Sequence, residues 1–320
     1  MLKSEYAIEA KHLYKSYGKN EVLKGIDLRI ERGTMLALLG PNGAGKTTIV
    51  RIISTLLAFN DGTVTVEGYD IVTEADKVRG VIGLTGQSAA IDELLTGREN
   101  LVMMGRLYRL TKASAKARGQ ELLEEFDLLD AADRPAKTYS GGMRRRLDLA
   151  VSLIATPPIL FLDEPTTGLD PRSRLAMWEI IRKLMAQGTT ILLTTQYLEE
   201  ADQLADRIIV IDDGRIIAEG TATELKRTVG KDRLEITFKD AASLKLGIQA
   251  LGKNVVDTNE KDSSATLVIQ DTNTDVKKAL DLLGAKKIAI TSLVIHKPTL
   301  DDVFLSLTGK QKKTKSEGAQ

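Results

Sequence analysis

The sequence contains no cysteine, which excludes disulfide bonds and thiolate metal sites and suits a reducing compartment. No apolar run approaches the ~20 residues that are needed to span a bilayer. The amino-terminal stretch, MLKSEYAIEAKHLYKSYG, interrupts its apolar positions with charges and lacks the apolar centre of a signal peptide. Since the formal net charge is only +1, a global electrostatic grip on nucleic acid is not expected either. We therefore expect a chain that is soluble by itself.

The residues that are present suffice for a sizeable core and two domains. Of the 320 residues, 42% are hydrophobic and 28% are charged, which is an ordinary balance for a globular protein. Up to about Arg227, short apolar strands alternate with helical segments, which predicts an α/β domain with a mostly parallel sheet flanked by helices. The runs expected to form central strands are TMLALLG (34–40), PILFLDEP (158–165) and TTILLTTQ (189–196).

A helical subdomain is expected within this first domain, between about residues 90 and 156. The strand pattern disappears there, and GRENLVMMGRLYRL and KARGQELLEEFDLL indicate helices. Thr96 and Glu99 have the spacing of a capping box at the start of the first of these helices. Further along, RIIVIDDGRIIAEGT predicts a β-hairpin with Asp213 and Gly214 as its tight turn.

A second, small domain is expected over residues 231–309, so that the first domain covers residues 1–230. RLEITF, VVDTNEK, ATLVIQD and AITSLVIH indicate strands, and AASLKLGIQALG and DVKKALDLLGAKK indicate helices. The resulting order β-α-β-β-α-β is that of a ferredoxin-like α+β domain. Residues 310–320 hold four lysines and no apolar anchor, which predicts a disordered tail. The alternative for these lysines is a weak attraction to anionic lipid headgroups.

The stretch GPNGAGKTT follows a predicted buried strand and opens a predicted helix, which is the context of a phosphate-binding loop. Its glycines allow consecutive backbone amides to turn toward one anion, and the helix amino terminus adds a partial positive charge. Lys46 is expected to reach the β- and γ-phosphates of a nucleotide, and the hydroxyl of Thr47 is expected to bind Mg²⁺. The residues of this loop are Gly40, Pro41, Asn42, Gly43, Ala44, Gly45, Lys46, Thr47 and Thr48.

A second motif, ILFLDEP, carries two acidic residues to the end of a predicted strand. Asp163 is placed to hold the magnesium ion through water, and Glu164 is placed to accept a proton from an attacking water. Together with the phosphate-binding loop, this motif predicts a nucleoside triphosphatase that uses Mg²⁺.

A third motif, TYSGGMRRRLDLA, places Ser140, Gly141 and Gly142 at the start of a predicted helix, which is itself an anion site. Because one chain already has a phosphate-binding loop, a second anion site suggests that each phosphate tail is held between two copies of the protein. The arginines 144–146 that follow are expected on a solvated face of this helix.

From about Tyr6 to Thr221 the sequence resembles the nucleotide-binding subunit of an ATP-binding-cassette transporter, with the motifs in family order. The resemblance implies that Tyr17 stacks on the adenine; the alternative is a strand aromatic that faces the core. It implies that Gln87 contacts Mg²⁺, the attacking water and the permease. It also implies that residues 140–142 cap the ATP of the partner subunit and that Asp170 crosses the dimer interface.

Two positions depart from the common family pattern: Met143 stands where a glutamine is usual, and Gln196 stands where a histidine usually contacts the γ-phosphate. Glutamine at this sensor place, together with the appended small domain, resembles the daunorubicin/doxorubicin-resistance exporter ATPase subfamily. The alternative for Gln196 is a loop residue that hydrogen-bonds to the next helix. The only histidines, His12 and His296, lie on strand-like segments away from the phosphate motifs and are expected to be ordinary packed or surface residues.

The function implied by the resemblance is that of an ATPase subunit of an exporter. It homodimerises around two ATP molecules at the cytoplasmic face of the membrane and drives a separate permease that exports a hydrophobic compound such as an antibiotic. The alternative is a soluble cassette ATPase that acts on nucleic acid or ribosomes. The near-neutral charge, the single cassette and the lack of a long charged coiled-coil insertion argue against it. The small domain is expected to be a dimer brace or a permease-docking piece, with a sensor for a small ligand as the alternative.

Overall fold

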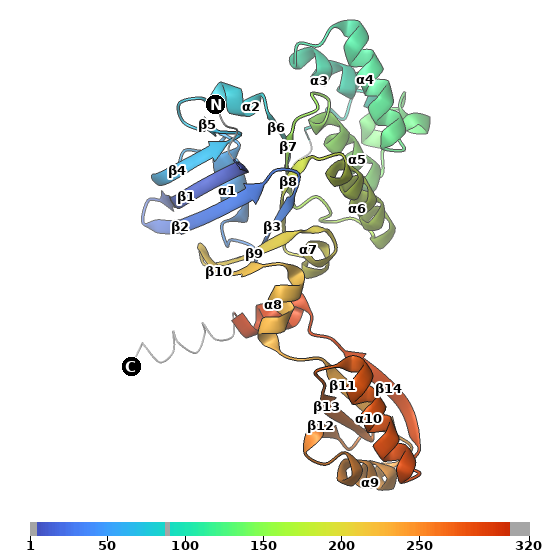
Figure 1. Ribbon diagram of the computed structural model, residues 1–320. Helices are drawn as coiled ribbons and strands as arrows, with labels where there is room; N and C mark the ends of the chain where they lie inside the picture. Colours follow the sequence, from blue (N-terminus) through green and yellow to red (C-terminus); the bar gives the residue numbers. More distant parts are fainter. Residues whose placement is uncertain (1–4, 87–89, 308–320) are drawn as a thin grey trace. The chain divides into compact units, whose positions relative to one another are not determined.

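The computed structural model describes residues 5–86 and 90–307, which form two compact units, one up to Ala222 and one from Thr223 (Figure 1). Helix α8 (Ala222–Val229) is thereby counted almost entirely with the second unit, whereas the sequence places the boundary near Gly230. Within the described ranges, no helix combines the length and the apolar character that a membrane crossing requires.

The centre of the first unit is a six-stranded sheet with the strand order β10-β9-β3-β8-β7-β6. Five of these strands run parallel, and β10 pairs antiparallel with β9. Every residue of β3, β7 and β8 is buried, as expected for strands that read as continuous apolar runs. The strands are β3 (Met35–Leu39), β6 (Ile82–Thr85), β7 (Ile159–Asp163), β8 (Thr190–Thr195), β9 (Arg207–Asp212) and β10 (Arg215–Gly220).

A four-stranded antiparallel sheet, in the order β2-β1-β4-β5, packs on the central sheet. Helix α1 (Lys46–Ile53) contributes Ile49, Val50, Ile52 and Ile53 to a hydrophobic cluster that includes residues of both sheets. The strands are β1 (Tyr6–Tyr17), β2 (Asn20–Glu31), β4 (Asp61–Val66) and β5 (Tyr69–Asp70), and α2 (Ala75–Arg79) follows them. The cluster thus holds the helix of the phosphate-binding loop in a fixed place.

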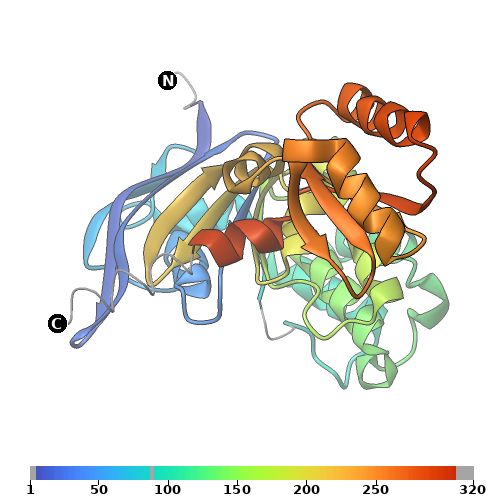
Figure 2. The same cartoon turned by 90° about the horizontal axis from the view of Figure 1, so that it is seen from below.

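The predicted helical subdomain lies on the other side of the central sheet from the antiparallel sheet (Figures 1 and 2). Its first helix begins with the predicted capping box, in which the side chains of Thr96 and Glu99 each accept a hydrogen bond from the other residue's amide. The elements are α3 (Gly97–Leu107), α4 (Lys112–Glu125), the 3₁₀ turns η1 (Leu129–Ala131) and η2 (Ala136–Thr138), and α5 (Gly141–Ser152).

Helix α6 (Pro171–Ala186) and helix α7 (Leu198–Leu204) complete the first unit, and a side chain of α6 donates a hydrogen bond to a buried carboxyl group of α7. Glu200 of α7 is 0% exposed, and its Oε1 accepts hydrogen bonds from Thr166 Oγ1 (2.8 Å) and Trp178 Nε1 (3.2 Å). Burial raises the pKa of Glu200 above its ordinary value of 4.5, although hydrogen bonds from Thr195, Thr166 and Trp178 oppose the shift.

The second unit has the predicted β-α-β-β-α-β order in one antiparallel sheet, with the strand order β12-β13-β11-β14. Leucines of both helices and apolar residues of the strands form a separate hydrophobic core, so the helices cover one face of the sheet. Residues 300–307 are helical. The elements are β11 (Arg233–Phe238), α9 (Ala241–Leu251), the 3₁₀ turn η3 (Gly252–Asn254), β12 (Val255–Asn259), β13 (Ser264–Val268), α10 (Thr272–Ala285) and β14 (Ile290–His296).

The core of the second unit gives a first prediction. A methyl group at Gly247 of α9 would lie 2.4 Å from the ring atoms of buried Phe238, whereas one at Gly284 of α10 would meet no atom within 4 Å. Gly247→Ala should therefore destabilise the second unit by about 1–3 kcal/mol through overpacking. The control Gly284→Ala should be neutral or stabilising by up to about 1 kcal/mol, because alanine favours the helix.

Urea unfolding of the full chain can test this if it is followed by far-ultraviolet circular dichroism. Tryptophan or tyrosine fluorescence would miss the second unit, because the single tryptophan and all seven tyrosines precede Ala222. Equal stability changes in the two variants would contradict the predicted contact with Phe238.

The buried Glu200 gives a second prediction. A carboxyl group whose pKa is raised by folding stabilises the protein most below its unfolded pKa, and this contribution is lost as the pH rises through the folded pKa. Glu200→Gln removes the buried charge, so its stability relative to the parent should be greater at about pH 8 than at about pH 5. Denaturant midpoints at both pH values measure this, with the exposed neighbour exchanged (Glu199→Gln) as control. A stability difference that does not change with pH would refute the prediction.

Candidate active site

The phosphate-binding loop spans the gap between the end of β3 and the start of α1, as the sequence predicts. Gly43 and Gly45 have φ angles of 84° and 108°, which favour glycine, and Gly45 is the N-cap residue of α1. A Cβ at Gly40 would lie 2.2 Å from the carbonyl oxygen of Ile211. The first turn of α1 contains no acidic residue and has no side-chain cap, so its amides remain available to an anion.

Lys46 is only 4% exposed, and its ammonium group is directed back over the loop. Its Nζ donates hydrogen bonds to the carbonyl oxygens of Gly40 (2.8 Å) and Pro41 (3.0 Å), and it lies 3.8 Å from Glu164 Oε1. Burial lowers the pKa of Lys46, while the charges of Glu164 and Asp163 act in the opposite direction. The loop and the strand that carries the acidic pair therefore meet at this group.

Asp163 and Thr47 lie together, as the motif reading predicts. The hydroxyl of Thr47 lies 3.2 Å from Asp163 Oδ1, and the hydroxyl of Thr194 at the end of β8 donates a short hydrogen bond to the same oxygen. Thr194 belongs to none of the sequence motifs. Its only signal is its place at the carboxyl end of a central strand, next to the strand that carries Asp163.

Glu164 follows β7 directly and has a left-handed backbone, with φ = 52°. Its amide donates to the carbonyl oxygen of Thr194 (3.0 Å), and its Oε2 accepts a hydrogen bond from Thr167 Oγ1 (3.2 Å). A hollow of about 340 Å³ lies beside Glu164 and is lined also by Gly141, Thr167 and Leu169. The carboxylate therefore has both a fixed orientation and a free space next to it.

The start of α5 is organised as the Ser-Gly-Gly motif predicts. Ser140 is the N-cap residue, and its hydroxyl accepts a hydrogen bond from the amide of Met143 (3.3 Å). Gly142 allows a close approach to Ser173, because a Cβ there would lie 2.6 Å from Ser173 Oγ. Ser173 in turn donates to Asp170, which caps α6. Ser140, Gly141 and Asp170 are exposed.

The remaining candidate residues are less constrained. Gln196 directly follows β8 and is half-buried. The loop alternative requires a hydrogen bond from its side chain to α7, and the described part of the chain contains none. Tyr17, the last residue of β1, is 49% exposed, with Lys15 Nζ 4.9 Å from its ring centre, so the core-facing alternative is wrong. Gln87 lies outside the described residues.

The expectation that arginines 144–146 form a solvated helix face is wrong for Arg145 and Arg146, whose side chains are 12% and 20% exposed, whereas that of Arg144 is 40% exposed. Arg144 pairs with Glu93 (2.9 Å), and Arg146 donates to the carbonyl oxygen of Phe126 (2.8 Å). Arg145 is 12% exposed and donates to backbone carbonyls at the ends of β6 and β7, beside Glu164. Nothing in the sequence distinguishes Arg145 from its neighbours, because the difference depends on which strands α5 packs against.

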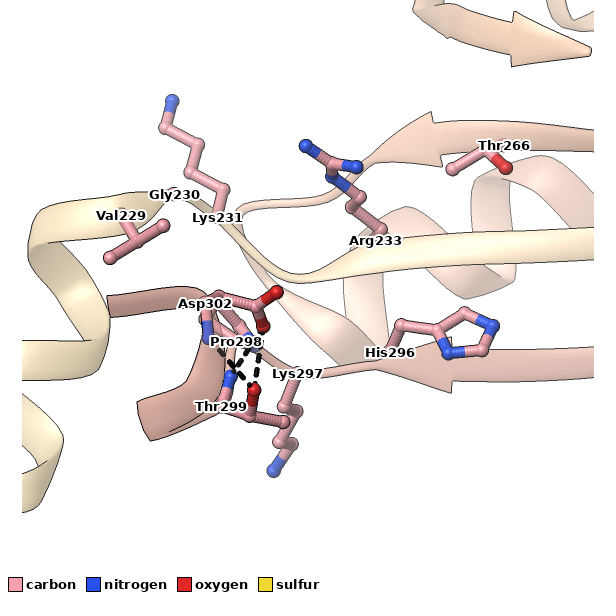
Figure 3. A pocket seen from close by; sticks show the side chains of 10 residues that line it. All are labelled: Val229, Gly230, Lys231, Arg233, Thr266, His296, Lys297, Pro298, Thr299 and Asp302. Carbon is pink, nitrogen blue, oxygen red and sulfur yellow. Dashed lines mark hydrogen bonds between the residues drawn. The ribbon is translucent and has the colours of Figure 1, made fainter. Parts of the chain in front are cut away.

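The second unit contains a separate hollow of about 420 Å³, shown in Figure 3. The amide and hydroxyl of Thr299 both donate to Asp302 Oδ2 at 2.8 Å, which fixes one wall of the hollow. Arg233 and Lys231 extend to one side of the chain in this view, and Lys297 extends to the other (Figure 3). Positive charge is thus present around this hollow but does not converge on one point.

Known proteins match this chain over nearly its whole length. Residues 23–167 match the family model described as ABC transporter, and residues 220–308 match the model described as ATP-binding protein DrrA1-3-like, C-terminal domain. The chain is 51% identical to the daunorubicin resistance ATP-binding protein DrrA3 of Streptomyces coeruleorubidus, over 98% of this chain and 99% of that protein. It is 37% identical to the linearmycin resistance ATP-binding protein LnrL of Bacillus subtilis, over 95% of this chain and 98% of that protein.

Solved structures resemble the first unit. An ATP-binding subunit of an ABC transporter has a TM-score of 0.63 at 30% identity, over 69% of this chain and 92% of that one. A dimeric ATP-binding cassette in a post-hydrolysis state, bound to ADP and Pi, has a TM-score of 0.61 at 27% identity, over 67% of this chain and 98% of that one. Given this fold, these motifs and the identity over nearly its full length, the chain belongs to the ATP-binding proteins of ABC transporters, in the group of the daunorubicin/doxorubicin resistance ATPases.

Proposed function

We propose that the protein is the ATP-hydrolysing subunit of an exporter, that it dimerises around two ATP molecules, and that it drives a separate membrane permease. The observation that carries this proposal is the convergence of Lys46, Asp163 and Glu164 at one edge of the central sheet. These are a phosphate-binding cation, a carboxylate beside the Thr47 hydroxyl and a carboxylate free to accept a proton, which are the groups that phosphoryl transfer to water requires.

The chain's own residues divide this chemistry between them. The uncapped amides of α1 and the ammonium of Lys46 bind the phosphates, and Tyr17 stacks on the adenine. Thr167 holds Oε2 of Glu164, so the carboxylate is oriented to accept the proton of the attacking water. Gln196 donates a hydrogen bond to the γ-phosphate from the end of β8, and Gln87 contacts the same water.

The residues fit a magnesium ion at Thr47 and Asp163. Their Oγ1 and Oδ1 atoms are hard oxygen donors 3.2 Å apart, and Thr194 orients the carboxylate through a further hydrogen bond. Gln87 is the third residue proposed to hold the ion, which Asp163 would contact through water. When bound, the ion supplies positive charge that neutralises the phosphate oxygens in the transition state.

The proposed dimer is supported by exposed residues at the starts of two neighbouring helices, α5 and α6. Ser140 and Gly141 lie exposed at the amino terminus of α5, and a Cβ at Gly141 would meet no atom within 4 Å. This helix end is suited to cap the ATP of a second copy, with Gly142 held beside Ser173. Asp170, exposed at the adjoining start of α6, is proposed to cross the interface.

The permease and the cargo are proposed from the relatives. Proteins named for resistance to daunorubicin, doxorubicin and linearmycin match this chain over nearly its full length, which supports export of a hydrophobic antibiotic-like compound. The protein then lies at the cytoplasmic face of the membrane, bound to its permease. The alternative of a cassette ATPase acting on nucleic acid or ribosomes has no support in the charge of +1 or in these relatives.

Glu164→Gln tests the catalytic assignment and the dimer together. The amide keeps the shape of the side chain but cannot accept the proton, so the variant should bind ATP, lose hydrolysis and accumulate as a dimer. Size-exclusion chromatography with ATP and Mg²⁺ measures this. The control Lys46→Ala should bind ATP more weakly, lose hydrolysis and form less of the dimer, since a charge-assisted contact is worth roughly 1.5–3 kcal/mol. A Glu164→Gln protein that retains ATP but stays monomeric at high concentration would argue against the ATP-sandwich dimer.

Gln196 gives a further prediction. Its amide can donate to the γ-phosphate but cannot take up a proton near neutral pH. Gln196→Ala should lower turnover about ten- to a hundredfold, the scale of one hydrogen bond to a charged group. Gln196→His should retain much of the activity and add a pH dependence near pH ~6.5. The control exchanges His12 and His296 for asparagine and should leave the parent's pH–rate profile unchanged. Full activity of Gln196→Ala would exclude the sensor role.

A further inference from the structure

Arg145, in the second turn of α5, is a nearly buried cation that donates hydrogen bonds to four backbone carbonyls at the ends of β6 and β7. Its Nε donates to the carbonyl oxygen of Pro165 (2.8 Å), and its Nη2 donates to those of Asp163 (3.1 Å) and Glu164 (3.0 Å). Its Nη1 donates to the carbonyl oxygen of Gly86 (2.6 Å) at the end of β6. One planar guanidinium thus ties the last residue of β7 and the two residues that follow it to α5 and to the end of β6.

Asp148, one turn further along α5, serves as the counter-ion of Arg145. The two side chains approach to 3.5 Å, and Asp148 is only 2% exposed. Its Oδ1 accepts a hydrogen bond from the amide of Ala90 (2.6 Å). The pair therefore fixes Gly86 and Ala90, on the two sides of residues 87–89, to the same helix. Each charge needs the other, because burial lowers the pKa of Arg145 and raises that of Asp148.

Glu164 depends on these contacts more than an ordinary residue at a strand end. Its backbone is left-handed, a conformation that costs of order 1–3 kcal/mol for a residue other than glycine and must be held by its surroundings. The amide of Glu164 is held by Thr194, and its carbonyl is held by Arg145. The direction of the carboxylate follows from this backbone, so loss of the carbonyl contact would let the side chain turn.

We propose that Arg145 is a positioning residue for ATP hydrolysis, with Asp148 as its counter-ion. It holds Glu164 in its catalytic conformation and links it rigidly to α5, whose first residues are proposed to cap the partner's ATP. The inference rests on the proposed function. It adds to that function a connection between Glu164, which acts on the ATP of its own subunit, and the start of α5, which is proposed to cap the ATP of the partner. Hydrolysis then requires α5 in its place, whereas binding of ATP to the phosphate loop does not.

The geometry calls for arginine in particular. The accepting carbonyls lie on two different strand ends, and the flat fork of the guanidinium reaches them with all three nitrogens. A lysine keeps the charge that Asp148 needs, but its single nitrogen cannot serve both strand ends. Arg145→Lys therefore removes the hydrogen bonds that position Glu164 while it keeps the positive charge beside Asp148.

The test compares Arg145→Lys with the matched control Arg146→Lys. Arg146 is the next residue of the same helix and also donates to backbone carbonyls, those of Phe126 and Asp127, but these do not belong to the site. Turnover, KM, the Kd for ATP and thermal unfolding are measured for both, with the permease present if the isolated subunit hydrolyses too slowly. Arg145→Lys should lower kcat about tenfold or more while the Kd for ATP changes less than about threefold. Arg146→Lys should leave kcat near that of the parent.

A second readout separates positioning from general damage to the site. In the Glu164→Gln background, Arg145→Lys should still form the ATP-dependent dimer, because positioning of the general base is no longer needed there. If Arg145→Lys does not fold, Asp148→Asn replaces it: its amide oxygen can still accept from Ala90, while the counter-ion is lost, and kcat should again fall without weaker ATP binding.

Three results would overturn the inference. They are a parental kcat in Arg145→Lys, a parallel loss of ATP affinity and kcat, and equal effects in Arg145→Lys and Arg146→Lys. These results differ from failure of the proposed function, in which Lys46→Ala would retain ATP binding and hydrolysis.

Discussion

The arrangement of the site depends on one constraint: the ammonium group of Lys46 is buried and must find its partners inside the protein. A buried ammonium without partners is strongly unfavourable, so its neighbours must supply oxygen atoms and negative charge. Two carbonyls of its own loop and the carboxylates of Asp163 and Glu164 do so. These partners come from the ends of β3 and β7, which lie on either side of β8 in the sheet. The strand order is therefore what brings the loop and the acidic pair together.

A second cation, Arg145, is only 12% exposed and meets the same strand end. Lys46 reaches it from α1, which both sheets hold in place, and Arg145 reaches it from α5 of the helical subdomain. Backbone carbonyls satisfy a large part of both charges, so each cation fixes the course of the chain as well as neutralising an acid. Glu164 contacts both cations: its carboxylate lies 3.8 Å from Lys46 Nζ, and the carbonyl of its left-handed backbone accepts a hydrogen bond from Arg145. The chemistry is thus located where two differently built parts of one unit meet.

The fold of the second unit does not depend on these two cations. Its core is a separate cluster between two helices and one face of an antiparallel sheet, and its helices begin at aspartate caps, Asp240 and Asp271. Alternating apolar residues in β11 and the regular spacing of leucines in α9 make this architecture readable from local pattern alone. The division after Ala222 and the family match from residue 220 agree closely in where this unit begins.

The sequence by itself determined the features whose cause is local. The glycines with positive φ around the phosphate loop, the capping box of Thr96 and Glu99, and the hairpin turn at Asp213 and Gly214 follow from residue types a few positions apart. Only the tertiary structure decided that the guanidinium of Arg145 is largely enclosed, that Thr194 joins Asp163 and that Glu200 is fully buried. Three adjacent arginines on one helix look alike in a sequence. What separates them is the position of strand ends up to 59 residues away along the chain, which no local pattern encodes.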